Sequence, residues 1–458
     1  MPFSAMGILV LSQWEVGSSW ASNYHGNFHS FLLVNNKGKN MRTTKRARVA
    51  AVLTVGALAL VAAACGDKKT AETTTVAPET TVAAETTAAP ETSAPVSTEA
   101  PATTEAALTG VELAKARIAE FSKTPTDLGL TEAVKSIPAG AKVVYVQCSV
   151  PVCAAIGEGI KAATAAIGGE FVAITHQDTA DTVQAAFQQA IQAKPTMVMT
   201  SGNPREWFAD ELKQLNDLKI PVVGWSIPEP YKTEGFAANL VTGDDYWFNG
   251  VLFADYVAAK TEGKGNVLFI TIPQFPVLGI EEQGFKDEIA QVCPDCKVKY
   301  EEVTVPDLIA GKHISTLIAD LQADPSVNFI VTGFGDMIIG LPDALAAAGV
   351  GAGVPIISQA GTPLNYAMIA AGQQEADMAL PTSFLGWRAV DAGLRAINGQ
   401  DAGTFAARPL TTFADHANVA ISGVPLQILT KDAIKDPAVA WPGVEGFEAA
   451  FKALWGVA

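Results

Sequence analysis

Polar and aromatic side chains follow a series of short apolar runs in this 458-residue sequence. Each run has the composition of a strand buried in a parallel sheet, and open α/β sheets bind ligands outside the carboxyl ends of their strands. Aromatic faces and hydrogen-bonding groups alternate at these ends, which suits a small polar ligand. The candidate ligand-binding residues are Ser149, Gln177, Asn203, Trp225, Ser226, Phe275, Phe334, Asp336, Gln359 and Thr362.

The same ends offer carboxylates that could act as an acid and a base, such as Asp178 and Asp336. The sequence contains no nucleophile elbow, no histidine-based triad and no glycine-rich phosphate loop. His313 and His416 stand alone, without a metal-ligand partner at a fixed spacing. We therefore expect no catalytic residues, no metal and no cofactor, and an extracellular enzyme remains the alternative.

The cysteines other than Cys65 form two close pairs, Cys148 with Cys153 and Cys293 with Cys296. A zinc site of four thiolates is one interpretation. However, Cys148 falls at the carboxyl end of a run, whereas Cys293 and Cys296 precede a run, so the pairs should lie apart. In an exported protein two local disulfides are the favoured prediction.

The elements that must position these residues alternate regularly. Apolar runs are followed by stretches with apolar residues at three-to-four spacing, as in Thr182–Ala193. This order predicts α/β architecture with doubly wound parallel sheets. The predicted strands are Lys142–Ser149, Glu170–Thr175, Thr196–Thr200, Ile220–Trp225, Gly265–Ile272, Val298–Val303, Phe329–Thr332 and Val354–Ile357, which form two similar lobes.

Several segments resemble the two-lobed, ribose-binding type of solute-binding protein that serves ABC importers. They are Lys219-Ile220-Pro221-Val222-Val223, Gly243-Asp244-Asp245 with Gly250, Gly284-Phe285 and Ala360-Gly361-Thr362-Pro363. The resemblance covers roughly Ala141–Gln400. It implies a type I periplasmic-binding-protein fold with three crossovers, near Asn239–Gly243, Ala379–Ser383 and Ala417–Ser422, and a ligand between the lobes. Asp245 joins the ligand-binding candidates here, and helix capping is its alternative role.

This sequence departs from sugar-binding relatives at positions that would meet a sugar. It has Trp225-Ser226 where they carry Asp-Arg, Gly335 where they carry Asn, and Ala360 where they carry Asp. Because a buried hydroxyl without a partner costs about 1–3 kcal/mol, a less hydroxylated or more aromatic ligand than ribose is expected. We predict that Trp225 and Phe334 face each other across the cleft, with polar contacts from Ser226, Asp336 and Gln359.

The first hundred residues have a different composition. A cationic start at Met41 precedes the apolar run Val49–Ala64, a secretory signal pattern. The run ends in Ala62-Ala63-Ala64-Cys65-Gly66, which resembles the lipobox of bacterial lipoproteins and implies lipid attachment at Cys65. The following segment is rich in Thr, Ala, Pro and Glu and lacks aromatic residues, so it cannot form a core.

These observations divide the chain into the following expected parts: 1–40, a non-native N-terminal extension; 41–64, a lipoprotein signal peptide; 65–107, a disordered tether; 108–140, a helical lead-in; 141–242 plus 382–417, lobe 1; 243–381 plus 418–432, lobe 2; and 433–458, a C-terminal segment.

The expected function follows from the resemblance. It is a monomeric, lipid-anchored receptor on the outer face of the cytoplasmic membrane, which captures a sugar or sugar-like solute and delivers it to an ABC permease and its ATPase. A ligand sensor for a membrane kinase is the alternative. A formal charge of −16 and the lack of a basic stripe argue against a nucleic-acid partner.

Overall fold

The computed structural model describes residues 108–402, 422 and 424–458. By its internal contacts the chain divides into Met1–Thr98 and Glu99–Ala458, and every described residue belongs to the second unit. The expected signal peptide, lipid-bearing Cys65 and tether lie outside the described residues. Most of the third expected crossover, Ala417–Ser422, lies outside them too.

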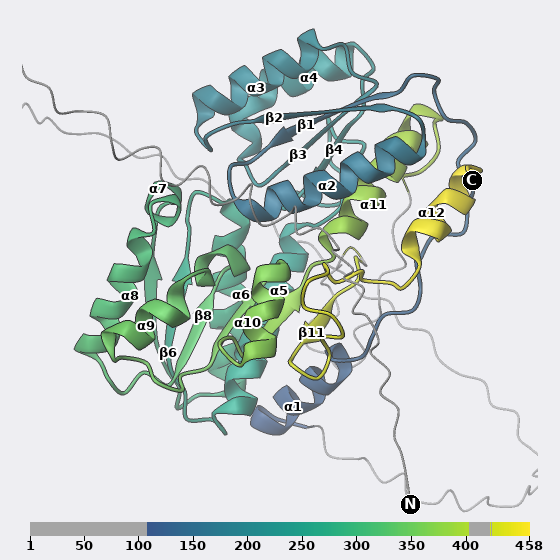
Figure 1. Cartoon of the computed structure of the whole chain (residues 1–458). Helices are drawn as coiled ribbons and strands as arrows, with labels where there is room; N and C mark the ends of the chain where they lie inside the picture. Colours follow the sequence, from purple (N-terminus) through teal and green to yellow (C-terminus); the bar gives the residue numbers. More distant parts are fainter. Residues whose placement is uncertain (1–107, 403–421, 423) are drawn as a thin grey trace, which may run out of the picture. The chain divides into compact units, whose positions relative to one another are not determined.

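The first sheet has five parallel strands in the order β2-β1-β3-β4-β5 (Figure 1). Its strands are β1 (Lys142–Gln147), β2 (Glu170–Thr175), β3 (Met197–Ser201), β4 (Val222–Trp225) and β5 (Ala238–Asn239). Its helices are α2 (Pro151–Ala166), α3 (Ala180–Gln192), α4 (Ala209–Asp217) and α11 (Thr382–Ile397), with the 3₁₀ turn η1 (Arg205–Phe208).

Alternate residues of β1 enter two different cores, which explains its continuous apolar run. Val143 and Tyr145 pack in the core that includes residues of α2 and α11, whereas Val144 and Val146 pack in the core that includes residues of α3. All four side chains are fully buried, and burying each contributes about 1.5–3 kcal/mol. The strand is therefore covered on both faces, as in a doubly wound sheet.

The second sheet has six strands in the order β11-β10-β9-β8-β6-β7. Its strands are β6 (Asn266–Thr271), β7 (Lys297–Glu302), β8 (Phe329–Thr332), β9 (Ile356–Gln359), β10 (Ala376–Ala379) and β11 (Gln427–Leu429), of which β11 runs antiparallel to β10. Its helices are α5 (Gly243–Lys260), α6 (Pro276–Val292), α7 (Val305–Ile309), α8 (Lys312–Ala323), α9 (Leu341–Ala348) and α10 (Pro363–Ala371), with the 3₁₀ turn η2 (Gly335–Ile338). All eight strands expected from the sequence are present, and the prediction of two parallel-sheet lobes is confirmed.

Two glycines set the distance between α5 and α6. A side chain at Gly250 would overlap the carbonyl group of Glu281, and one at Gly284 would overlap that of Trp247. The two helices therefore pack with their backbones close together. This contact fixes the start of α6, where Val277, Leu278 and the preceding Phe275 reach the cavity described below.

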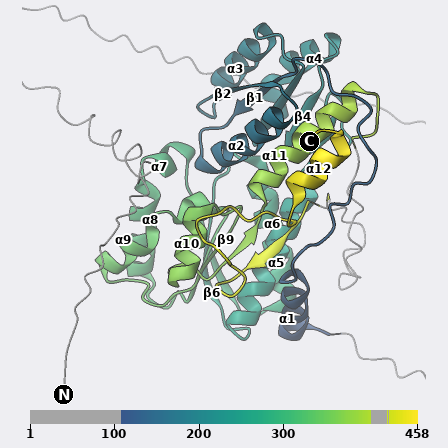
Figure 2. The same ribbon diagram turned by 45° about the vertical axis from the view of Figure 1, so that its right-hand side comes forward.

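The segments outside the βα repeats fasten the ends of the chain. Helix α1 (Gly110–Phe121) buries Arg117, which pairs with Glu288 of α6 and Asp255 of α5. Helix α12 (Phe447–Trp455) packs on α11, where Trp455 stacks on Trp387 with ring centroids 5.2 Å apart. Figure 2 shows α1 beside α5 and α12 beside α11. Within the described residues, no helix combines the length and apolar character needed to span a membrane.

Candidate functional site

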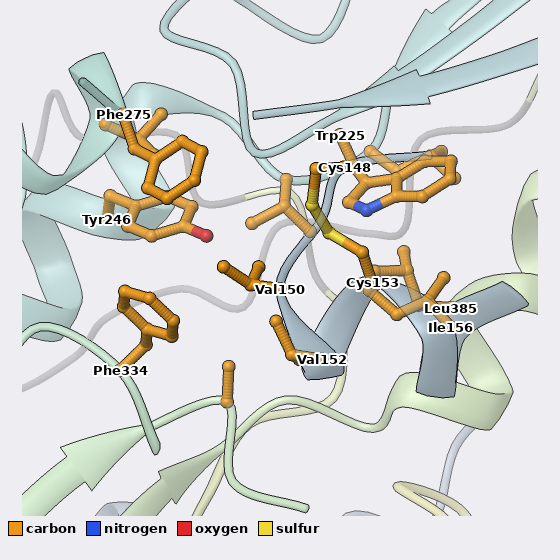
Figure 3. Close-up of a cluster of buried hydrophobic side chains, with 14 of the residues drawn as sticks. Cys148, Val150, Val152, Cys153, Ile156, Trp225, Tyr246, Phe275, Phe334 and Leu385 are labelled. Carbon is orange, nitrogen blue, oxygen red and sulfur yellow. A yellow bond between two sulfur atoms is a disulfide. The ribbon is translucent and has the colours of Figure 1, made fainter. Parts of the chain in front are cut away.

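A cavity of about 60 Å³ lies where the carboxyl ends of the two sheets meet (Figure 3). Its walls come from both lobes, and most of its lining is apolar. The lining residues are Cys148, Val150, Val152, Cys153, Ile156, Ser201, Gly202, Trp225, Ser226, Tyr246, Phe275, Val277, Leu278, Phe334, Gln359, Ala360 and Leu380. Ligand pockets usually measure about 300–1,000 Å³, so the two walls lie close together around a much smaller space.

The wall of the first lobe is built around a disulfide. It joins Cys148, which follows β1, to Cys153 in the first turn of α2. The short link brings Val150 and Val152 to the cavity, and in Figure 3 Val150 lies between Trp225 and Phe334 in the view shown. The sulfur atoms and two valines therefore form an apolar surface where a strand end usually offers polar groups.

Trp225 ends β4 and completes this wall. Its indole lies against the ring of Tyr145, with centroids 5.2 Å apart, and only 1% of the residue is exposed. The next residue, Ser226, has a left-handed backbone with a φ of 55°. Such backbones are uncommon outside glycine, and they concentrate at functional sites.

The wall of the second lobe is aromatic. Phe275 precedes α6 and meets Phe334, which follows β8, in an edge-to-face pair with centroids 6.2 Å apart. Tyr246 of α5 donates a hydrogen bond of 2.9 Å from its hydroxyl to Ser226 Oγ of the first lobe. Burial raises the pKa of the Tyr246 phenol above its ordinary value, so the phenol stays protonated as a donor.

The two walls also touch directly. A β-carbon built on Gly202 of the first lobe would lie 3.6 Å from the ring of Phe275. Asp336 in η2 reaches α2 of the first lobe, where its Oδ2 accepts a 3.0 Å hydrogen bond from the backbone N–H of Val152. A carboxylate at a helix N-terminus is stabilised by the unpaired N–H groups there.

Asp336 is nevertheless buried, and this dominates its ionisation. Burial raises its pKa to about 7 from an ordinary value of 3.8, although the Val152 hydrogen bond acts in the opposite direction. Its second carboxyl oxygen has no hydrogen-bond partner among the described residues. Opening the lobes would break the hydrogen bond between this carboxyl group and the Val152 N–H.

Glu281 stands one turn beyond Val277 and Leu278 on α6 and is fully buried. Neither of its carboxyl oxygens has a hydrogen-bond partner among the described residues. Burial raises its pKa well above the ordinary range. The charge it would carry also acts on the Tyr246 phenol, which places the two groups near each other behind the cavity wall.

The polar strand ends of the first lobe bond to one another rather than line the cavity. Asp178 Oδ2 accepts hydrogen bonds from the Ser149 backbone N–H at 3.0 Å and from its hydroxyl at 2.5 Å. His176 lies 3.4 Å from Asp178 through Nδ1 and 3.2 Å from the Asn203 amide nitrogen through Nε2. Burial lowers the His176 pKa, so the ring is neutral at pH 7.

The structure thus separates the predicted ligand-binding residues into two sets. Trp225, Ser226, Phe275, Phe334 and Gln359 line the cavity. Ser149 and Asn203 belong to the first-lobe network, Gln177 is exposed, and Asp336 bonds to Val152. Asp245 and Thr362 take part in capping boxes at the starts of α5 and α10, and Asp245 also accepts hydrogen bonds from Ser422.

Sequence reasoning missed most of the apolar lining. Val150, Val152, Ile156, Val277, Leu278 and Leu380 line the cavity beside the residues that were singled out. A search for polar strand ends cannot find such residues, because in the sequence an apolar lining residue looks the same as an apolar core residue. The available signal was the Cys148–Cys153 spacing, which ties the two valines to a strand end.

The four described cysteines lie as two pairs at disulfide distance, Cys148 with Cys153 and Cys293 with Cys296. The second pair sits in the turn between α6 and β7. In residues 108–402, 422 and 424–458, no group of three or more His, Cys, Asp or Glu side chains is arranged to hold a metal ion.

Comparison with known protein families identifies the class. The family model of the periplasmic binding protein domain matches residues 142–401, which is more than half of the chain. The chain belongs to this family, whose members are binding proteins. A comparison with curated protein sequences finds no match.

Solved structures with the same fold include several sugar-binding proteins. A glucose-galactose binding protein from Geobacillus stearothermophilus is 19% identical, with a TM-score of 0.53 over 65% of this chain and 100% of that one. An ABC transporter solute-binding protein from Agrobacterium vitis, bound with α-D-tagatopyranose, is also 19% identical, with a TM-score of 0.53 over 65% and 97%. An ABC sugar transporter subunit from Rhodobacter sphaeroides is 21% identical, with a TM-score of 0.52 over 64% and 98%. At these identities the likeness concerns the fold.

Proposed function

We propose that this protein captures a small solute between its two lobes and presents the closed form to the permease of an ABC importer. The observation that carries the proposal is the cavity between the carboxyl edges of the two sheets, with Trp225 and Ser226 from one lobe and Phe275, Phe334 and Gln359 from the other. These five residues are the proposed ligand-binding set. The similar structures include a glucose-galactose binding protein and a solute-binding protein bound with α-D-tagatopyranose, so sugars are the first solutes to examine.

A thermal-shift screen of the purified protein tests capture directly. The panel contains sugars, polyols, nucleosides, amino acids and small aromatic alcohols. A solute that binds the folded state at 100 times its Kd stabilises it by about 2.7 kcal/mol, or roughly 4 °C for a chain of this size.

The control separates the cavity from the rest of the surface. Phe334→Ala should remove the shift, because its ring forms part of the wall. Phe171→Ala, a half-buried residue of β2 outside the cavity, should leave the shift intact. If a solute shifts both variants as much as the parent protein, the cavity is not the binding site.

We further propose export and lipid attachment at Cys65, followed by a tether over residues 65–107. Supporting this are the signal pattern before Cys65 and membership in a family of periplasmic binding proteins. Replacing Cys65 with Ser should release the protein from membranes of the producing cell, since a single terminal lipid group is then missing. Retention of the Cys65→Ser protein on salt-washed membranes would refute lipid anchoring, and the proposal of solute capture does not depend on this result.

The division into two lobes is part of the same proposal: residues 141–242 plus 382–417 for the first lobe and 243–381 plus 418–432 for the second. Supporting it are the two separate sheets and the packing of α11 against α2.

A further inference from the structure

The cavity wall contains few polar side chains. Of the seventeen lining residues, Ser201, Ser226, Tyr246 and Gln359 carry a hydroxyl or amide group, and none of the seventeen carries a charged side chain. The remainder are aliphatic, aromatic, glycine or disulfide-bonded cysteine. Ligand pockets combine an apolar surface with a small number of placed polar groups, and this one lies at the apolar extreme.

The hydroxyl and amide side chains of the lining already have partners. Tyr246 donates to Ser226 Oγ at 2.9 Å, and Gln359 Nε2 donates to the Gly333 carbonyl oxygen at 2.9 Å. Ser201 Oγ lies 3.1 Å from the Tyr145 hydroxyl. A ligand hydroxyl must therefore compete for one of these bonded groups or accept from the Trp225 indole N–H. The Tyr246–Ser226 hydrogen bond bridges the lobes, so it is the one that opening would release.

The polar residues near the cavity lie behind its lining. Ser149 is bonded within the first lobe, and Asn203 and Asp336 each keep one oxygen without a hydrogen-bond partner among the described residues, but neither residue lines the cavity. A ligand hydroxyl buried without a partner weakens binding about 5- to 150-fold. A sugar with a hydroxyl on nearly every carbon would incur this loss several times over.

From these observations, and resting on the capture function proposed above, we infer that the solute is a small, mainly apolar molecule: an aromatic or alicyclic ring with one hydroxyl or comparable polar group. Its ring would lie between Phe275 and Phe334 of one lobe and Val150, Val152 and Trp225 of the other. Its polar group would lie at the Tyr246–Ser226 pair.

The energetics of closing favour the same class. Parting the lobes exposes Phe275 and Phe334 to water, and these rings are 7% and 4% exposed in the closed arrangement. A mainly apolar solute keeps these rings out of water when the lobes close around it. A polyhydroxylated solute would instead bury hydroxyl groups against the rings, where they lose their hydrogen bonds to water. Sulfur atoms such as those of Cys148 and Cys153 also make favourable contacts with aromatic rings.

A matched pair of probes tests the inference on the intact protein. Cyclohexanol and myo-inositol share one carbocyclic ring and differ in carrying one or six hydroxyl groups. Titration calorimetry at several temperatures, with benzyl alcohol and glucose as a second pair, measures affinity and the heat-capacity change. We expect cyclohexanol and benzyl alcohol to bind at least tenfold more tightly than their polyhydroxylated counterparts, with a negative heat-capacity change.

Variants of the wall connect this binding to the cavity. Phe334→Ala should weaken cyclohexanol binding two- to tenfold or more, and Phe171→Ala on β2 should leave it unchanged. Val152→Thr replaces a methyl group with a hydroxyl at nearly constant volume, so it tests apolarity with little risk to folding. It should weaken cyclohexanol binding severalfold.

The outcomes separate the two proposals. If myo-inositol or glucose binds more tightly than its counterpart, and Phe334→Ala weakens that binding, solute capture stands and the apolar class is overturned. If none of the four probes binds, the apolar class is overturned and capture in this cavity loses its support as well. The same follows if the probes bind the Phe334→Ala and Val152→Thr variants as tightly as the parent protein.

Discussion

The polar residues at the carboxyl edges of the two sheets differ in their hydrogen-bond partners. At the first edge, Ser149, His176, Asp178 and Asn203 contact one another within a single lobe. Near the second edge, Glu281 and Asp336 are buried with carboxyl oxygens that lack hydrogen-bond partners among the described residues. The first edge bonds its polar side chains mainly to one another, although Asp178 Oδ1 and Asn203 Oδ1 have no hydrogen-bond partner among the described residues. At the second edge, neither carboxyl oxygen of Glu281 has a partner there, and Asp336 bonds across to the opposite lobe.

This difference indicates which edge responds to the state of the lobes. The hydrogen bonds among Ser149, His176, Asp178 and Asn203 lie inside one lobe, so they hold the strand ends in place whether the lobes are open or closed. A buried carboxyl group that meets the opposite lobe, as Asp336 meets Val152, changes both its hydration and its hydrogen bonding on closing. The first edge therefore stabilises its own lobe, whereas the contacts of the second edge change when the lobes open or close.

Removing the centre of the first-edge network should have the largest effect on stability. Asp178→Ala leaves the Ser149 N–H and hydroxyl without their acceptor, and it places alanine at a φ of 53°. We expect the free energy of unfolding to fall by about 2–4 kcal/mol, measured by urea denaturation.

The matched variant is Asp178→Asn, since asparagine tolerates the left-handed backbone and keeps one acceptor oxygen. It should lose less than half as much stability as Asp178→Ala. Equal, small losses in both variants would mean that the network does not hold the strand ends.

The disulfide of the first edge should come next. The Cys148→Ser, Cys153→Ser double variant removes a disulfide between residues separated by 5 positions in the sequence. By the chain-entropy relation, the free energy of unfolding should fall by about 2 kcal/mol. The Cys293→Ser, Cys296→Ser double variant, with separation 3, should cost a similar amount. We expect the first variant alone to change the Trp225 environment, seen in tryptophan fluorescence, because the Cys148–Cys153 pair lines the same cavity. Identical spectra for the two double variants would contradict this.

Much of the fold could be predicted from the sequence, because apolar runs report burial directly. Runs such as Phe329–Thr332 are strands with every residue buried, and the helical lead-in expected over 108–140 contains α1. The short strands β5 and β11 could not be recognised, since two or three residues carry no periodicity. The docking of α12 on α11 depends on tertiary packing around Trp455 and Trp387, which no local pattern reports.

The site was less predictable. Position at a strand end located Trp225 and Phe334, because the geometry of parallel sheets brings those ends together. The same criterion could not predict that Ser149 would donate its hydroxyl to Asp178, because both residues follow neighbouring strands in equivalent positions. Competition between possible partners is decided by distances in the folded chain, and the sequence gives none of these.

The contact between Asp336 and Val152 should make closing depend on pH. Burial raises the Asp336 pKa to about 7 in the closed arrangement, against 3.8 for an exposed aspartate. The closed form therefore holds its proton more tightly, and closing is favoured at low pH and disfavoured as pH rises through about 7. We expect the closing equilibrium to fall at least tenfold, about 1.4 kcal/mol, between pH 5 and pH 8, as followed by small-angle scattering.

Asp336→Asn should abolish this pH dependence while keeping an acceptor for the Val152 N–H. Asp377→Asn is the matched control. Burial also raises the pKa of Asp377 to about 7, but its partners Ser358 and Gly361 belong to its own lobe. The control should alter the pH dependence of unfolding and leave that of closing in place, and a change in closing would point to a different titrating group.

The smallest expected effect concerns Glu281, whose carboxyl oxygens have no partner among the described residues. Because burial raises its pKa above the ordinary range, the folded state binds this proton more tightly than the unfolded state. Its contribution to stability is present at low pH and is lost as pH rises through the raised pKa. Glu281→Gln has nothing to ionise, so relative to the parent it should gain about 1 kcal/mol at pH 8 and little at pH 5. This is the opposite sign to Asp178→Asn, and the comparison of the two edges fails if both amides lower the unfolding free energy equally at pH 8.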